Sequence, residues 1–137
     1  MKVEPYLSFD GRCDEAIEFY KSAVGAKVDM LMRFKDSPEP HPSGQFPPET
    51  ANKVMHASLR IGDSRVMVSD GRCTGQPKFF GICLSLAVSN DAEAQRLFAA
   101  LSNGGKVTMP MAKTFFTSSF GMVNDRFGVA WMILVHP

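Results

Sequence analysis

The sequence has few cysteines, no excess of charge of either sign and no long hydrophobic run. Its three cysteines, Cys13, Cys73 and Cys83, form no Cys-x-x-Cys pair, which argues against a zinc ribbon and against a secreted disulfide framework. The 15 Lys and Arg residues and the 14 Asp and Glu residues give a net charge of +1, too even to indicate a nucleic-acid or membrane-surface partner. The apolar run 129–135 has the length of a strand and is far shorter than the roughly 20 residues that span a bilayer.

The N-terminus also lacks the apolar stretch of a signal peptide or membrane anchor. We therefore expect a soluble, cytoplasmic protein with reduced thiols. Its 137 residues, 45% of them apolar and 21% charged, are typical of one globular domain that builds a core without disulfides or metals.

Hydrophobic periodicity predicts the same order of elements twice. Strands show apolar residues at every second position, and helices show the i, i+3, i+4, i+7 spacing of a buried stripe. The first half is predicted to contain a strand over 3–9, a helix from Asp14 to Ala23 ended by Gly25, and strands over 26–34, 53–61 and 65–69. The second half is predicted to contain a strand over 82–88, a helix from Asn90 or Asp91 to about Ser102, and strands over 106–111, 120–123 and 129–135. The five prolines in 36–50 predict a loop.

An internal duplication accounts for this repetition. A shift of 79 residues moves Phe19 onto Phe98 and Gly25 onto Gly104, and a shift of 64 superimposes the hairpins. The two shifts differ by 15 residues, the length of the Pro-rich segment 36–50. The sequence therefore predicts an α+β fold of paired βαβββ modules with two main helices in a single domain, 1–137. Module one spans about 1–70, module two spans about 80–137, and the linker spans about 71–79.

One helix can cover only one face of a four-stranded sheet. We therefore expect the two modules to form a curved mixed sheet, an open trough around a common cavity. On the strand 53–61, alternation predicts that Met55, Ala57, Leu59 and Ile61 pack under the helix, whereas Val54, His56, Ser58 and Arg60 face the trough.

Several motifs resemble one known superfamily along essentially the whole chain. The run from Pro5 to Gly11, followed by Ala16 to Lys21, resembles the start of many vicinal oxygen chelate (VOC) proteins, which include glyoxalase I, extradiol dioxygenases and the bleomycin- and fosfomycin-resistance proteins. Three further runs are similar to the PhnB-like branch: Met55-His56-Ala57, Met67 to Asp70, and Phe120 to Trp131. The resemblance implies a homodimer that binds a small molecule in the trough.

The resemblance also implies a divalent metal held by His and Glu side chains from four strands. The corresponding positions here are Pro5, His56, Cys83 and Met132. Pro5 has no donor side chain, and the Met132 thioether suits Cu(I) better than a hard divalent ion. A metal is therefore disfavoured as a cofactor, and if one is present only His56 and Cys83 are expected to bind it.

Members of this branch are also labelled demethylubiquinone methyltransferase-like. The chain has no Gly-x-Gly-x-x-Gly motif after a predicted strand, so an S-adenosylmethionine methyltransferase is not expected.

The candidate catalytic residue is His56, which could act as an acid or base. The alternative is that His56 is a half-buried structural residue hydrogen-bonded to a neighbouring strand. Arg60 and Arg65 could pair with an anionic ligand or be solvated surface charges. Asp70 and Asp125 are interpreted as turn residues, and Trp131 as core or dimer packing. The candidate ligand-binding residues are Leu7, Phe9, Ser58, Cys83, Ser85, Phe120, Met122 and Met132.

Three functions remain open at this point. The first is a VOC-type enzyme (a lyase, isomerase or oxygenase) that acts on a small ligand through His56. The second is a metal-independent homodimer that sequesters its ligand, as the bleomycin-resistance proteins do. The third is a protein–protein interaction module. The sequence specifies neither the substrate nor the reaction.

Overall fold

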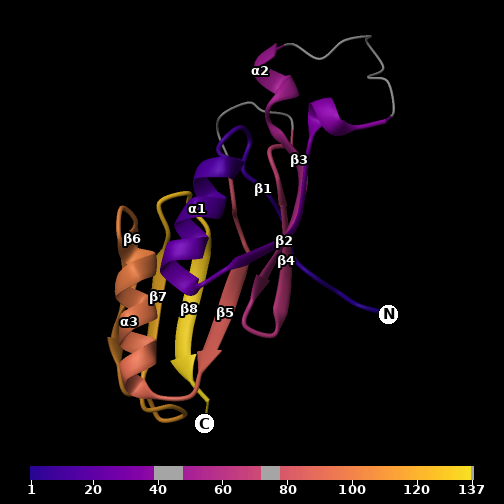
Figure 1. The fold of residues 1–137 in the computed structure, drawn as a ribbon. Coiled ribbons are helices and arrows are strands. Elements are labelled where there is room, and N and C mark those ends of the chain that lie inside the picture. Colours follow the sequence, from indigo (N-terminus) through magenta and orange to yellow (C-terminus); the bar gives the residue numbers. More distant parts are fainter. Residues whose placement is uncertain (39–47, 72–77, 137) are drawn as a thin grey trace. The chain divides into compact units, whose positions relative to one another are not determined.

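The computed structural model describes residues 1–38, 48–71 and 78–136, and the chain divides into two compact units (Figure 1). Unit one is Met1–Pro77 and unit two is Lys78–Pro137. No helix in the described residues is both long enough and apolar enough to cross a membrane.

Unit one consists of a four-stranded sheet and a long helix. Strands β3 and β4 form a hairpin, β2 pairs antiparallel with β3, and β1 pairs parallel with β4, which gives the order β1-β4-β3-β2. Its elements are β1 (Tyr6–Ser8), α1 (Cys13–Val24), β2 (Lys27–Arg33), the 3₁₀ helix η1 (Phe34–Asp36), α2 (Pro48–Ala51), β3 (Val54–Ile61) and β4 (Ser64–Ser69).

Unit two repeats this arrangement. Its sheet has the order β5-β8-β7-β6, and again only the pair that contains the first strand, β5 with β8, is parallel. Its elements are β5 (Cys83–Val88), α3 (Asp91–Ser102), β6 (Lys106–Ala112), β7 (Phe120–Asn124) and β8 (Ala130–Val135). The predicted α+β fold of two βαβββ modules with two main helices is therefore confirmed.

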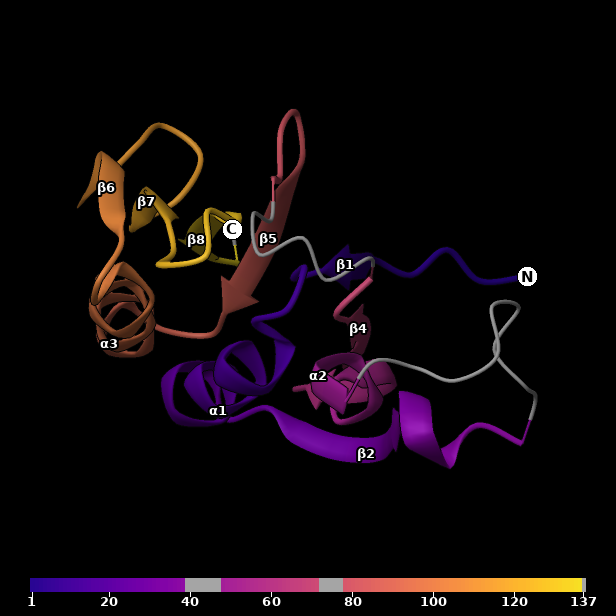
Figure 2. The same cartoon turned by 90° about the horizontal axis from the view of Figure 1, so that it is seen from above.

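Each long helix lies on one side of the sheet of its own unit (Figure 2). In α1 the predicted stripe is buried: Cys13, Ala16, Ile17, Tyr20 and Ala23. The helix ends at Gly25, whose φ of 67° is the left-handed conformation that glycine adopts without strain and whose N–H donates to the Tyr20 carbonyl.

Helix α3 begins and packs as the sequence predicts. The Asn90 side chain accepts a hydrogen bond from the Glu93 N–H at 2.8 Å, the expected N-cap. Phe98 lies so close to β7 that a Cβ at Gly121 would come within 2.6 Å of its ring. Because Gly121 has no side chain, α3 can pack closely against the sheet at this point. Trp131, expected in core or dimer packing, is buried within unit two, which favours the core.

Two features differ from the sequence-based expectation. The first strand covers Tyr6–Ser8 rather than 3–9, because Pro5 has no N–H for the ladder and Asp10 turns the chain with a φ of 48°. The segment 36–50 is not entirely loop, since η1 reaches Asp36 and α2 begins at Pro48, a residue type suited to the first position of a helix. The rest of this segment (39–47) and most of the expected linker (72–77, with Cys73) lie outside the described residues.

Asp70 does more than form a turn. Its buried carboxylate accepts hydrogen bonds from the N–H of Cys13 at 2.8 Å and from the N–H of Val54 at 2.7 Å, so it ties the start of α1 to the start of β3. Burial, together with the negative charges of Asp70 and Asp14, raises the pKa of the Cys13 thiol well above its ordinary value. In unit two, Asp125 accepts hydrogen bonds from two turn N–H groups, those of Phe127 and Val129, and from the Trp131 indole N–H.

We predict that Asp70→Ala lowers the free energy of unfolding by roughly 3 kcal/mol, because two buried N–H groups lose their charged acceptor. Urea denaturation followed by circular dichroism measures this loss. Asp63→Ala in the exposed β3–β4 turn is the control, with an expected change within about 0.5 kcal/mol. Equal losses in the two variants would contradict the anchoring role of Asp70.

Candidate functional site

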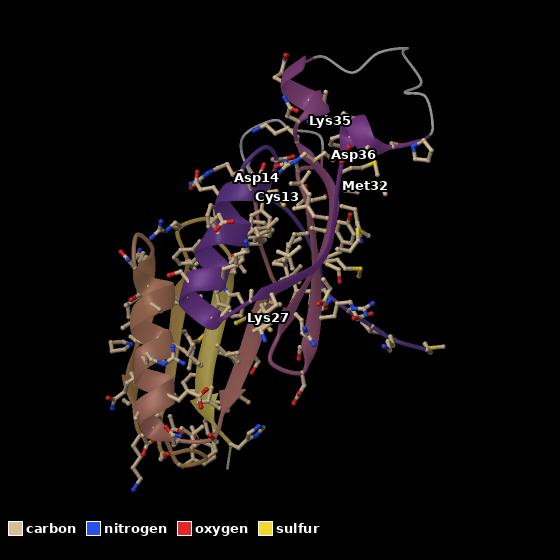
Figure 3. All side chains as sticks on the ribbon, viewed as in Figure 1. Cys13, Asp14, Lys27, Met32, Lys35 and Asp36 are labelled. Carbon is tan, nitrogen blue, oxygen red and sulfur yellow. The ribbon has the colours of Figure 1, made fainter. Side chains whose placement is uncertain are left out.

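The face of the unit-one sheet opposite α1, called here open face one, carries His56. Because side chains alternate along a strand, the residues of this face follow from the strand register. One row across the sheet contains Tyr6, Met67, Ser58 and Met30. In the next row His56 lies beside Met32, which Figure 3 labels on β2.

Tyr6 and His56 form a hydrogen-bonded pair on this face. The Tyr6 hydroxyl lies 3.0 Å from His56 Nδ1, and the ring centroids are 5.5 Å apart. Tyr6 is 50% exposed and His56 is partly buried. When the phenol donates to Nδ1 of the neutral ring, the proton of the imidazole resides on Nε2. His56 can then offer an N–H donor to a bound molecule.

Ser58 lies two positions from His56 on the same side of β3. It is 7% exposed, and its Oγ has no hydrogen-bond partner among the described residues. A buried hydroxyl without a partner costs stability, since it has lost water and gained nothing in return. Ser58 therefore has a buried hydroxyl whose hydrogen-bonding capacity is unused within the described residues.

The face of the unit-two sheet opposite α3, called here open face two, is largely apolar. One row across it contains Ser85, Met132, Met122 and Met109. Phe120 lies in the next row and packs edge-on against Phe116, which in turn packs against the fully exposed Phe115. Ser85, Phe120, Met122 and Met132 thus share a face, and Cys83 precedes Ser85 by two positions on the same strand.

Leu7 and Phe9, expected at the ligand site, lie on the opposite side of their sheet. Both are buried, and Phe9 packs near the ring of Tyr20 on α1. The alternation of β1 turns Leu7 to the core and Tyr6 to open face one. Sequence reasoning missed Tyr6, although its place one residue before Leu7 was the signal that it faces away from the core.

The donor set at the four positions that VOC proteins use for a metal does not fit a hard divalent ion. Pro5 has no donor, and Met132 offers only a thioether. Cys83 is exposed rather than buried, yet desolvation raises the pKa of its thiol, partly offset by a hydrogen bond from the Met132 backbone. Within residues 1–38, 48–71 and 78–136, His, Cys, Asp and Glu side chains form no group of three that could hold a metal ion.

The fold defines the class of protein. The chain shares its fold with the fosfomycin resistance protein FosX from Listeria monocytogenes, at 6% identity, a TM-score of 0.67, and coverage of 100% of this chain and 93% of FosX. It therefore has the fold of the VOC proteins.

Comparison of the sequence with family models and with known proteins identifies the family within this fold class. A family model described as 3-demethylubiquinone-9 3-methyltransferase matches residues 1–134, and the chain belongs to this PhnB-like family. Protein YjdN from Escherichia coli (strain K12) is 39% identical over 142 residues, covering 98% of this chain and 95% of YjdN.

Two solved structures share both the fold and the length of the chain. Protein PA1353 from Pseudomonas aeruginosa is 41% identical, with a TM-score of 0.83 and coverage of 99% of this chain and 98% of PA1353. A putative 3-demethylubiquinone-9 3-methyltransferase, PhnB protein, from Bacillus cereus is 24% identical, with a TM-score of 0.78 and coverage of 98% and 99%. The predicted membership of the PhnB-like branch is confirmed.

We predict that Ser58→Ala leaves the free energy of unfolding unchanged or raises it by up to about 1 kcal/mol, because it removes a buried hydroxyl without a partner. Chemical denaturation measures the change, with the exposed Ser8→Ala as control. A loss of more than about 1 kcal/mol would mean that the hydroxyl makes a stabilising contact.

We predict that the Cys83 thiol is alkylated slowly at neutral pH, because its raised pKa keeps it protonated and the thiolate is the nucleophile. Peptide mapping by mass spectrometry after timed exposure to iodoacetamide follows Cys83 separately from the other thiols. The rate should rise with pH through a midpoint above that of an unfolded peptide with the sequence around Cys83. A midpoint below that of the peptide would show that the thiol is activated.

Proposed function

We propose that the protein binds a small molecule on open face one through the Tyr6–His56 pair. The observation that carries this proposal is the 3.0 Å contact between the Tyr6 hydroxyl and His56 Nδ1. It orients the imidazole on the sheet face opposite α1. His56 Nε2 and the Ser58 hydroxyl can both donate, so the proposed ligand has hydrogen-bond acceptors such as carbonyl or carboxylate oxygens.

The same pair supports an acid–base role for His56. An imidazole can pass a proton between a ligand and solvent near neutral pH, and a hydrogen bond to its second nitrogen fixes which nitrogen does so. In this proposal Tyr6 acts as a positioning residue. No step requires a metal, in keeping with the donor chemistry of Pro5, Cys83 and Met132.

Methyl transfer, the activity in the family's description, is not the reaction proposed here. An S-adenosylmethionine site in a doubly wound fold needs a glycine-rich turn after a parallel strand, and this sequence contains no Gly-x-Gly motif.

A second candidate function is ligand sequestration without chemistry, by a homodimer. Open face two favours it, since the row of Met109, Met122 and Met132 has adaptable, polarizable side chains that suit an irregular apolar ligand. Mass spectrometry of the bound molecule separates the two candidates, because an enzyme releases a changed molecule and a sequestering protein releases the same one.

We predict that Tyr6→Phe changes the tautomer of the His56 ring. With the hydroxyl gone, nothing in the described structure holds Nδ1 as an acceptor, so the fraction of rings with the proton on Nδ1 should increase. Nitrogen-15 NMR of the imidazole measures this fraction, and Tyr20→Phe on the α1 side is the control. An unchanged tautomer ratio would show that Tyr6 does not orient the ring.

The binding proposal is tested with a library of small oxo- and hydroxy-acids in a thermal shift assay. Any compound that raises the melting temperature should lose about tenfold or more in affinity with His56→Leu, which removes the N–H donor that the ligand would use. His136→Leu, on an exposed histidine beyond β8, should leave the affinity unchanged. A compound bound equally well by wild-type and His56→Leu protein would place its site elsewhere.

A further inference from the structure

Beyond the Tyr6–His56 pair, open face one continues into a charged row near the β3–β4 turn. Arg60 on β3 and Arg65 on β4 are direct Cα partners in the hairpin and form the centre of this row. Glu4, ahead of β1, forms an ion pair with Arg65, and Asp29, at a bulge in β2, forms one with Arg60. The Cα partner of Arg60 on β2 is Lys27, so the centre of the row is positive, with one carboxylate beside each arginine.

The two arginines are only loosely paired with their acidic neighbours. Arg60 Nη2 lies 3.4 Å from Asp29 Oδ1, and Arg65 Nε lies 3.8 Å from Glu4 Oε2, each through one nitrogen. Both guanidinium groups are about half exposed, so these ion pairs contribute little. Each guanidinium has five N–H donors, most of which remain available.

Two like charges directly opposite each other in a sheet destabilise it, and an anion placed between them removes the repulsion. The same residues line a surface recess of about 460 Å³. Lys2 adds a third cation to its lining, and Asp63 adds a third carboxylate. The lining thus has no net charge, and the charged groups that β3 and β4 contribute to it are the two guanidinium groups of Arg60 and Arg65.

We propose that Arg60 and Arg65 form an oxyanion site that binds a carboxylate or phosphate group of the ligand. The inference rests on the proposed function for its assumption that a ligand occupies open face one. Planar guanidinium groups match the oxygens of such anions with paired hydrogen bonds. Glu4 and Asp29, each beside one of the two arginines, repel an anion and so confine it to the space between the guanidinium groups.

The position of this site defines the class of ligand more closely. Arg60 follows Ser58 by two residues and His56 by four along the same side of β3. At about 3.3 Å per residue, these spacings are roughly 7 Å and 13 Å. A molecule that reaches from the arginines to Ser58 and His56 has the length of a common metabolite, with an anionic group at one end and a neutral acceptor oxygen toward the other.

Titration with inorganic phosphate, and separately with acetate, tests the oxyanion site. Two-dimensional NMR follows the backbone amides of residues 60 and 65 and the arginine Nε–Hε groups, at an ionic strength held constant with sodium chloride. We expect saturable shifts at both arginines, with a dissociation constant that rises about tenfold in Arg60→Ala and in Arg65→Ala. A stronger effect of phosphate or of acetate identifies which anion the site prefers.

Arg96→Ala is the matched control, since Arg96 is exposed on α3 in unit two. It should leave the dissociation constant unchanged. Circular dichroism verifies that each variant is folded. Absence of saturable shifts, or equal shifts in wild-type and Arg60→Ala/Arg65→Ala protein, would overturn the inference.

The same titration in His56→Leu separates this inference from the proposed function. Binding of phosphate at the arginines should persist, because the imidazole lies four residues away along β3. Persistence of the arginine shifts supports the oxyanion site even if no library compound depends on His56. Loss of these shifts in His56→Leu would instead contradict a separate anion site at the hairpin.

Discussion

The constraint on which the rest of the structure depends is that one helix covers only one face of a four-stranded sheet. In each unit the long helix buries an apolar stripe against one face, and the described residues form no second long helix for the other. Strand alternation then fixes which side chains occupy the uncovered face. The candidate chemistry of this protein lies on those two faces because everything on the helix side is needed for the core.

The two open faces carry different side chains although the two sheets have the same strand order and pairing. The shift of 79 residues takes Tyr6 to Ser85 and Met30 to Met109, and the shift of 64 takes His56 to Phe120 and Ser58 to Met122. The observed rows of both sheets follow these equivalences. The polar side chains Tyr6, His56 and Ser58 of open face one thus correspond to Ser85, Phe120 and Met122 on open face two, so the first face has an imidazole where the second has a phenyl ring.

Much of the fold could be predicted from the sequence because its signals are local. Apolar spacing, the Asn90 cap and Gly25 specify the helices through contacts within a few residues, and the two shifts reveal the duplication without any structure.

The site was harder to predict. His56 and Ser58 were identified from alternation on a single long strand, whereas β1 has three residues, too few for alternation to show that Leu7 and Phe9 face the core. The loop predicted over 36–50 failed at its ends because short helices there need only a proline at the right position or a few backbone hydrogen bonds.

By itself the sequence determined the order of elements, the repeat and, on the long strand β3, the face on which His56 and Ser58 lie, since these depend on periodicity and on neighbours in the chain. Only the tertiary structure decided which residues from different strands meet. The pairing of Tyr6 with His56 joins residues 50 positions apart, and it depends on β1 lying parallel to β4 in a particular register. The same holds for the Asp70 carboxylate, which accepts hydrogen bonds from the N–H groups of Cys13 and Val54 in two separate elements. Such contacts are set by sheet pairing over long sequence separations, a property that no local pattern encodes.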